Sequence, residues 1–135
     1  MKPHVLASVA WKTTDFPLCS LNIRVSDLAR SLDMQVATWI EDGLGETRGF
    51  ACRIASGRAL LVSEHIYAIS HMNGKGPEVY VEASDLMSDD IETVLADVLS
   101  GLQITRDAVE WRQPDAAVEG ARLLCRQVEQ WRSGS

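Results

Sequence analysis

Hydrophobic and polar residues alternate near the start of this chain, and a period of two is typical of β-strands that bury one face. The pattern predicts one strand over residues 4–12 and a second over residues 19–25. The residues between them, 13–17, are typical of a turn. We therefore expect these two strands to pair as a hairpin.

Three other segments carry hydrophobic residues three or four positions apart, which predicts helices with one apolar stripe. The first follows Ser26, a suitable N-cap, and ends at Gly43 and Gly45. The second follows Ser88, and the third begins at Asp115. The stripes consist of Leu28, Leu32, Val36, Trp39 and Ile40; of Ile91, Val94, Leu95, Val98, Leu99 and Leu102; and of Val118, Ala121, Leu124, Cys125, Val128 and Trp131.

Between the first two helices, the pattern predicts three strands over residues 50–54, 59–71 and 78–83. The middle strand is hydrophobic at 60, 61 and 62 in succession, so we expect it to be central and covered on both faces. A further short strand is predicted near 107–112. In the strand over 78–83, the residues expected to face solvent are Glu78, Tyr80 and Glu82.

These elements define an α+β fold, because short connections dominate and favour antiparallel pairing. We expect an antiparallel or mixed sheet of about five to six strands with three helices, in the order ββαβββαβα. At 135 residues and 46% hydrophobic, the chain suits a single globular domain over 1–135. The last residues, 133–135, are interpreted as a disordered end or a cloning remnant.

The net charge of −6 is spread unevenly along the chain. Residues 76–105 contain seven acids and no lysine or arginine. Such an excess of negative charge disfavours nucleic-acid and membrane partners and favours a basic protein. The residues predicted to form this contact are Glu78, Tyr80, Glu82, Asp85, Asp89, Asp90, Glu92 and Asp97. Asp89, Asp90 and Glu92 would also complement the start of a helix, so solubility and helix stabilisation are competing explanations.

No motif in the sequence predicts a catalytic, cofactor-binding or metal site. The glycines at 43, 45 and 49 miss the dinucleotide-binding spacing, and Gly74–Lys75–Gly76 lacks the spacing of a phosphate-binding loop. His65 and His71 would lie roughly 20 Å apart on one strand, too far to share a metal ion. Cys52 alternates with Phe50 and Ile54, as a core residue would, although a thiol site with His65 or His71 stays open.

The three cysteines are odd in number and scattered, which favours reduced thiols and a cytoplasmic location. The first seven residues have no long apolar run of the kind found in a secretory leader. Trp131, near the end of the last helix, is the tryptophan best placed for an exposed contact, although core packing is the commoner role.

The leading hypothesis is a non-catalytic acidic module that binds a basic protein, for example an immunity-type inhibitor of a bacterial toxin such as a nuclease. This is an analogy of size and charge. The alternatives are a secretion-type chaperone or homodimeric adaptor, which would use a strand edge or apolar groove, and a small-molecule-binding or enzymatic domain. The module would act as a monomer or a homodimer.

Overall fold

The computed structural model describes residues 4–5, 14–41, 45–65 and 76–133. In these residues it contains β1 (His4–Val5), β2 (Phe16–Leu21), α1 (Val25–Ser31), β3 (Ala37–Glu41), β4 (Gly45–Arg53), β5 (Ala59–His65), β6 (Glu78–Val81), η2 (Ala83–Leu86), α2 (Ile91–Gly101), η3 (Arg106–Ala108), β7 (Val109–Arg112) and α3 (Asp115–Ser133).

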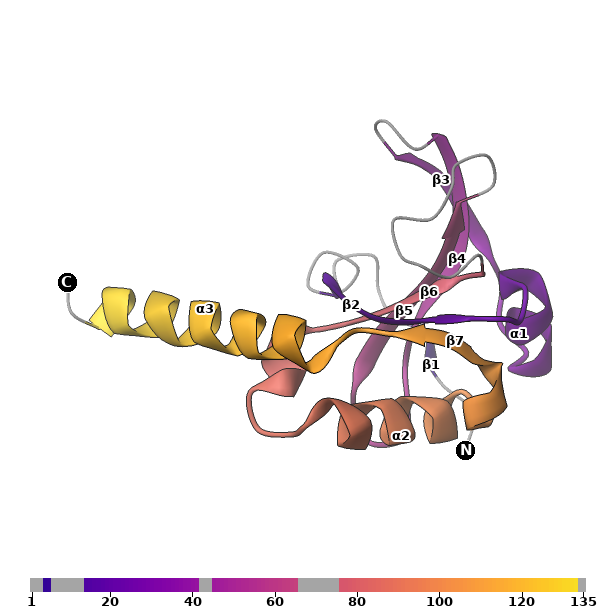
Figure 1. Cartoon of the computed structure of the whole chain (residues 1–135). Helices are drawn as coiled ribbons and strands as arrows, with labels where there is room; N and C mark the ends of the chain where they lie inside the picture. Colours follow the sequence, from indigo (N-terminus) through magenta and orange to yellow (C-terminus); the bar gives the residue numbers. More distant parts are fainter. Residues whose placement is uncertain (1–3, 6–13, 42–44, 66–75, 134–135) are drawn as a thin grey trace.

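The strands form one antiparallel sheet, in which the two-residue β1 joins six longer strands. The strand order is β1-β4-β5-β6-β2-β7, and β3 pairs with the other end of β4. Figure 1 shows α2 along one side of the sheet, α1 near one end of the strands, and α3 projecting away from the body. The predicted α+β fold with three helices is confirmed, and so is the central position of β5.

A single hydrophobic core lies between the sheet and the helices α1 and α2. Alternate residues of β4, β5 and β6 enter it, as do the buried sides of the two helices. Gly101 allows α2 to approach the sheet closely, since a Cβ at this position would lie 2.5 Å from Ile54. The predicted stripe of α2 is therefore buried in full.

The predicted hairpin between the first two strands is wrong. The described part of β1 pairs with β4, and β2 lies between β6 and β7. All four residues from Leu18 to Leu21 are buried, so β2 is covered on both faces. Residues 6–13 lie outside the described part of the chain.

The first helix is shorter than the sequence pattern predicted. It ends at Ser31, where the N–H groups of Asp33 and Met34 donate to Arg30 and Ala29, and Asp33 adopts a left-handed φ of 57°. This is a Schellman-type end, which stops a helix without glycine. Residues 37–41 instead form β3 against β4, because their β-branched and aromatic side chains favour a strand. Gly45 consequently begins β4 and does not end a helix.

The predicted N-caps were also wrong. Arg24, not Ser26, precedes α1, and Asp90, not Ser88, caps α2. The Asp90 carboxylate accepts a 2.7 Å hydrogen bond from the backbone N–H of Thr93. This geometry assigns one of the predicted contact residues a role inside the fold.

Candidate protein-binding surfaces

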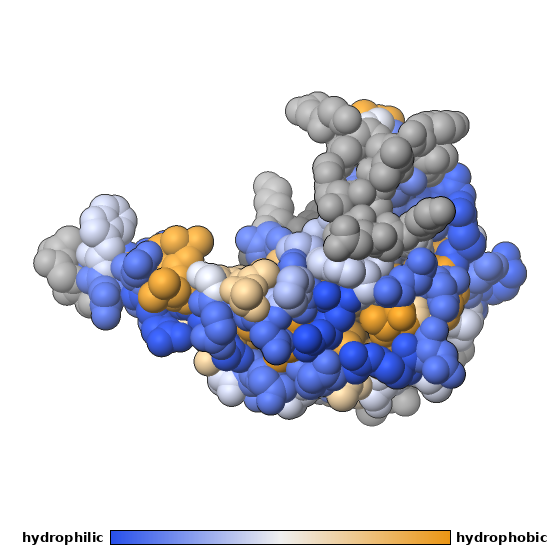
Figure 2. All heavy atoms as spheres, viewed as in Figure 1, coloured by the Kyte–Doolittle hydropathy of each residue, from blue (hydrophilic) through white to orange (hydrophobic). Residues whose placement is uncertain are grey.

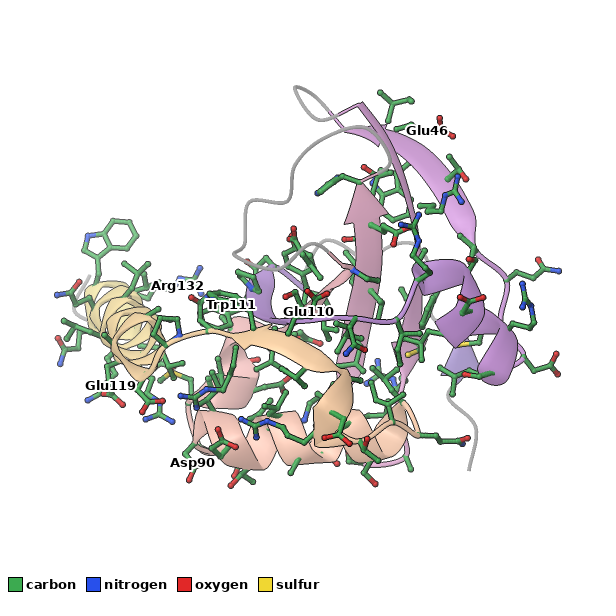
Figure 3. All side chains as sticks on the ribbon, turned by 45° about the vertical axis from the view of Figure 1, so that its right-hand side comes forward. Glu46, Asp90, Glu110, Trp111, Glu119 and Arg132 are labelled. Atoms are coloured by element: carbon green, nitrogen blue, oxygen red, sulfur yellow. The ribbon has the colours of Figure 1, made fainter. Side chains whose placement is uncertain are left out.

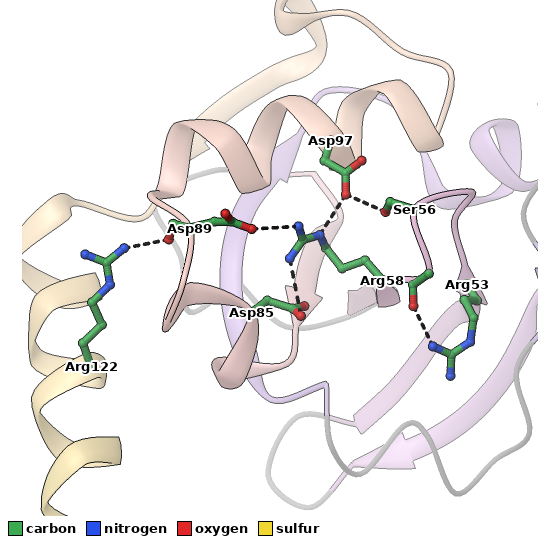
Figure 4. Close-up of polar contacts among 8 residues, drawn as sticks. Arg53, Ser56, Arg58, Asp85, Asp89, Asp97 and Arg122 are labelled. Carbon is green, nitrogen blue, oxygen red and sulfur yellow. Dashed lines mark hydrogen bonds and ion pairs between the residues drawn. The ribbon is translucent and has the colours of Figure 1, made fainter.

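Arg58 is the centre of the acidic region. It follows the tight turn at Ser56 and Gly57, where Gly57 has a φ of +95°, and its side chain is only 13% exposed. The guanidinium contacts three carboxylates (Figure 4). Its Nε lies 2.9 Å from Asp97, its Nη1 3.4 Å from Asp85, and its Nη2 3.5 Å from Asp89. We call these four residues the Arg58 cluster.

The Arg58 cluster joins residues from four parts of the fold. Asp85 lies on η2, Asp89 in the turn before α2, and Asp97 on α2, while Arg58 comes from the turn before β5. Ser56 adds a hydrogen bond of 2.6 Å from its hydroxyl to Asp97. The cluster therefore fixes α2 and η2 against the β4–β5 turn.

Burial and charge act against each other in this cluster. Burial alone would lower the pKa of Arg58, but the hydrogen bond to Asp97 and the charges of Asp85 and Asp97 raise it above its ordinary value. Burial raises the pKa of Asp85, although Arg58 opposes that shift. The Oδ2 atom of Asp85 is buried and has no hydrogen-bond partner among the described residues. One guanidinium and three carboxylates leave a formal charge of −2.

A hollow of about 310 Å³ lies beside the cluster. Its lining is polar, with three serine side chains as well as charged groups. The lining residues are Ser56, Gly57, Arg58, Ser84, Asp85, Ser88 and Asp89. The charged residues of this lining, Arg58, Asp85 and Asp89, sum to a formal charge of −1.

Glu92 and Asp90 belong to a second group at the start of α2. Glu92 accepts hydrogen bonds from Arg106, at 2.7 Å, and lies 3.0 Å from Arg112. The hydrogen bond from Arg106 lowers the pKa of Glu92, and the Thr93 N–H does the same for Asp90. A cavity of about 440 Å³ borders this group between α2, β7 and α3, and arginine side chains share its lining with acids.

The remaining predicted residues lie on β6 and just after it. Glu78 was predicted to face solvent, and this is wrong, since the residue is 2% exposed. It faces the side of the sheet opposite Val79, in register with Ser20 and Ser63, and it accepts a hydrogen bond from the Tyr80 hydroxyl. Tyr80 and Glu82 are partly buried. The eight predicted residues thus form three groups, and only Asp85, Asp89 and Asp97 meet around one centre.

Helix α3 presents a surface that the charge pattern did not indicate. Its first turns are attached to the body by buried Val118 and by Arg122, whose guanidinium donates to the backbone oxygens of Leu86 and Asp89 at 2.5 and 2.6 Å. Beyond them the helix extends into solvent, and Figure 3 shows its side chains pointing outward around it. Figure 2 shows hydrophobic residues on this projecting segment. The large exposed apolar residues of α3 are Leu123, Leu124, Val128 and Trp131, and Ile40 on β3 is also exposed.

Three of these residues share one side of α3. Leu124, Val128 and Trp131 follow Ala121 at spacings of three, four and three, which places all four on one side of a helix. Leu123 lies on another side. We call Ala121, Leu124, Val128 and Trp131 the α3 stripe. Leu124 is 61% and Trp131 77% exposed, whereas Val128 is 38% exposed and Ala121 is partly buried, so the second half of the stripe is the part most available to a partner.

Sequence reasoning missed both centres of these surfaces. Arg58 lies outside the acid-rich stretch 76–105 of the sequence, yet its guanidinium contacts Asp85, Asp89 and Asp97. The α3 stripe was identified as part of a hydrophobic pattern, but exposure was considered only for Trp131, and core packing was favoured even there. The heptad-like spacing of the stripe was the available clue, because a narrow seam of this kind often pairs with another helix.

The open thiol hypothesis meets an unfavourable geometry. Cys52 pairs with Leu60 on the core face, and burial raises the pKa of its thiol to about 12. His65 lies on the opposite face, where its ring nitrogen is 3.0 Å from the Thr47 hydroxyl. These two side chains cannot act together. His71, Gly43 and the 74–75 segment lie outside the described residues.

Within the described ranges, no group of three or more histidine, cysteine, aspartate or glutamate side chains is arranged so that it could hold a metal ion. No described helix has the length and apolar character needed to cross a membrane. No protein-family model matches the chain, and comparisons with curated proteins and with solved structures find no match either. The site must therefore be interpreted from its own geometry.

Proposed function

We propose that this chain is a non-catalytic protein-binding module and that the α3 stripe is its main contact surface. The exposure of the α3 stripe is the observation that carries this proposal. Large apolar side chains gathered on one exposed face are uncommon in chains that act alone, and they mark interaction sites. Trp131 is the natural anchor, because exposed tryptophans supply much of the binding energy at protein interfaces.

The Arg58 cluster has a secondary role in the same proposal. Its formal charge of −2 beside a polar hollow would attract a basic segment of a partner and speed the encounter. An immunity-type inhibitor of a basic toxin, such as a nuclease, is one form of this idea. Its support is weaker than the sequence suggested, because Arg58, Arg106 and Arg112 already compensate five acids, including Asp115.

The alternative form, a chaperone or homodimeric adaptor, receives more support from the geometry. Such a protein holds its partner through apolar contacts, and the α3 stripe offers them. The proposal includes a cytoplasmic location, which suits the buried thiols of Cys19 and Cys52. It assigns no catalytic role, because the buried Cys52 thiol and His65 lie on opposite faces of the sheet.

Affinity capture from the source cells tests the proposal with a matched pair of variants. Leu124→Glu places a charge in the α3 stripe, whereas Leu123→Glu places the same charge on an adjacent exposed position outside it. We expect Leu124→Glu to reduce recovery of the bound protein at least tenfold and Leu123→Glu to leave it within about twofold. Equal recovery by both variants would refute the stripe as the contact surface.

Salt separates the two forms of binding. Capture through the Arg58 cluster would fall steeply between low salt and about 1 M salt, because exposed charges are screened. It would also fall in Asp89→Asn, which removes one acid but keeps the size of the side chain. Capture through the α3 stripe would persist at high salt. Circular dichroism of each variant verifies that the fold is intact.

A further inference from the structure

We propose that the occupant of the α3 stripe is a second copy of this chain, bound through an antiparallel pair of α3 helices. This inference rests on the proposed function and specifies its partner. The contact would be isologous, meaning that the same four residues serve on both copies.

The spacing of the stripe fits pairing with another helix. Positions 121, 124, 128 and 131 follow the alternating steps of three and four that form the seam of a two-stranded coiled coil. On one flank of this seam lie Gly120 and Gln127, which carry no charge. A Cβ at Gly120 would meet no atom within 4 Å, so the flank is open. A second helix can therefore approach the seam closely.

The sizes of the stripe residues favour the antiparallel orientation. With the helices antiparallel and centred near residue 126, Trp131 packs on Ala121 of the second copy, and Leu124 packs on its Val128. Every layer then joins a larger side chain to a smaller one, which fills space evenly. A parallel pair would place Trp131 against Trp131 and Ala121 against Ala121, which crowds one layer and leaves a gap in the other.

The charges along α3 favour the same orientation. The first half of α3 carries Asp115, Glu119 and Arg122, which sum to −1, whereas Arg126, Glu129 and Arg132 in the second half sum to +1. Antiparallel pairing brings the acidic end of each helix towards the basic end of the other and aligns their dipoles favourably. A parallel pair would bring like ends together.

The size of the seam predicts a weak dimer. Residues 121–131 span roughly 15 Å of helix, and the exposed parts of three large side chains would bury roughly 400 Å² per copy. The total of about 800 Å² is below the range of stable complexes. We therefore expect a dissociation constant on the order of 10 to 100 μM.

Sedimentation equilibrium of the full chain tests the inference from about 5 to about 500 μM. The mass of the wild type should rise from 14.9 kDa towards twice that value. Leu124→Glu should raise the dissociation constant at least a hundredfold and remain a monomer throughout, while Leu123→Glu should dimerise like the wild type. A wild type that stays monomeric to the highest concentration, or a dimer that Leu124→Glu leaves intact, would overturn the inference.

Disulfide trapping tests the orientation. In a Cys125→Ser background, Gln127→Cys places a thiol beside the seam, and antiparallel pairing brings the two copies of this residue together across it. Gln130→Cys places the same group on a side of α3 away from the seam. Mild oxidation should link Gln127→Cys as a dimer and leave Gln130→Cys mostly unlinked. Equal linkage of both variants, or none at Gln127→Cys under conditions where the chain dimerises, would contradict the antiparallel pair.

The capture experiment separates failure of this inference from failure of the proposed function. A monomeric wild type that still captures another protein in a Leu124-dependent way would overturn the second copy as occupant and leave the protein-binding function standing. A monomer without any Leu124-dependent partner would refute both.

Discussion

The Arg58 cluster and the α3 stripe differ in how their side chains are exposed and compensated. In the cluster, acids that would form a strongly charged surface are held by a nearly buried guanidinium. In the stripe, apolar residues that would suit a core stand in solvent. Composition alone suggests a charged surface for the first segment and a core helix for the second, and the three-dimensional contacts of each segment reverse these roles. Accessibility therefore decides the function of a patch, and accessibility depends on contacts between segments distant in the sequence.

The difference follows from how each region is attached to the body. Helix α2 lies along the sheet, and its stripe enters the core. Among the described residues, Val118 and Arg122 in the first turns of helix α3 hold it against η2 and the turn before α2. The same helical pattern of hydrophobic residues is thus satisfied within the chain in α2 and left for a partner in α3.

The largest expected effect comes from truncating a leucine in each helix. Leu95→Ala in α2 removes a fully buried side chain, so it should lower the free energy of unfolding by about 3 kcal/mol. Leu124→Ala in α3 should change it by less than about 0.5 kcal/mol, because the side chain is already exposed. Urea unfolding of dilute protein measures both. Similar losses in the two variants would mean that the α3 stripe is packed in solution.

A smaller loss is expected from the centre of the acidic cluster. Arg58→Ala leaves three carboxylates without their common cation, and removing one partner of a largely buried ion pair is strongly destabilising, here by about 2 kcal/mol. Arg30→Ala is the matched control, because Arg30 is 80% exposed and its ion pair within the described part of the chain is with Asp27 on its own helix. The control should lose no more than about 0.3 kcal/mol.

The same urea measurements at pH 7 compare these arginine variants. If Arg58→Ala were as stable as Arg30→Ala, the acids of the cluster would be independently solvated. Their charge would then be available to a basic partner, and the acidic-surface hypothesis would regain its first form.

The fold was predictable wherever one period dominated the pattern. The α2 stripe and the β4–β5–β6 meander were identified because their apolar residues repeat at one spacing and enter one core. The helix predicted over residues 32–40 was wrong, because Leu32, Val36 and Trp39 fit a helical spacing although the segment does not form a helix. Backbone hydrogen bonds around Asp33 and the pairing of β3 with β4 decide that segment, and neither is local to the pattern.

The site was predictable only in composition. The excess of acids in residues 76–105 is visible in the sequence. The compensation of Asp85, Asp89 and Asp97 by Arg58 depends on a turn 27 to 39 residues away in the sequence. The exposure of α3 depends on how far the rest of the domain extends along this helix, and no local sequence pattern contains that information. Asp90 and Glu92 illustrate the middle case, since their position at a helix start was predictable and their partners were not.

The smallest predicted effect sharpens the contrast between buried and exposed ion pairs. Glu92 is about half exposed, and its contacts with Arg106 and Arg112 are screened by solvent. Glu92→Gln should therefore cost no more than about 0.5 kcal/mol at pH 7, well below the loss in Arg58→Ala. About 1 M salt should reduce this small difference further.

The stability difference between wild type and Glu92→Gln should depend on pH. The hydrogen bond from Arg106 lowers the pKa of folded Glu92 below the ordinary value of 4.5. The contribution of the Glu92 carboxylate to stability is therefore complete above pH 4.5, and it is lost as the pH falls through the lowered pKa of the folded state. Wild type and Glu92→Gln should differ at pH 7 and converge near pH 3. A difference that persists at acid pH would show that the substitution acts through packing and not through the charge of Glu92.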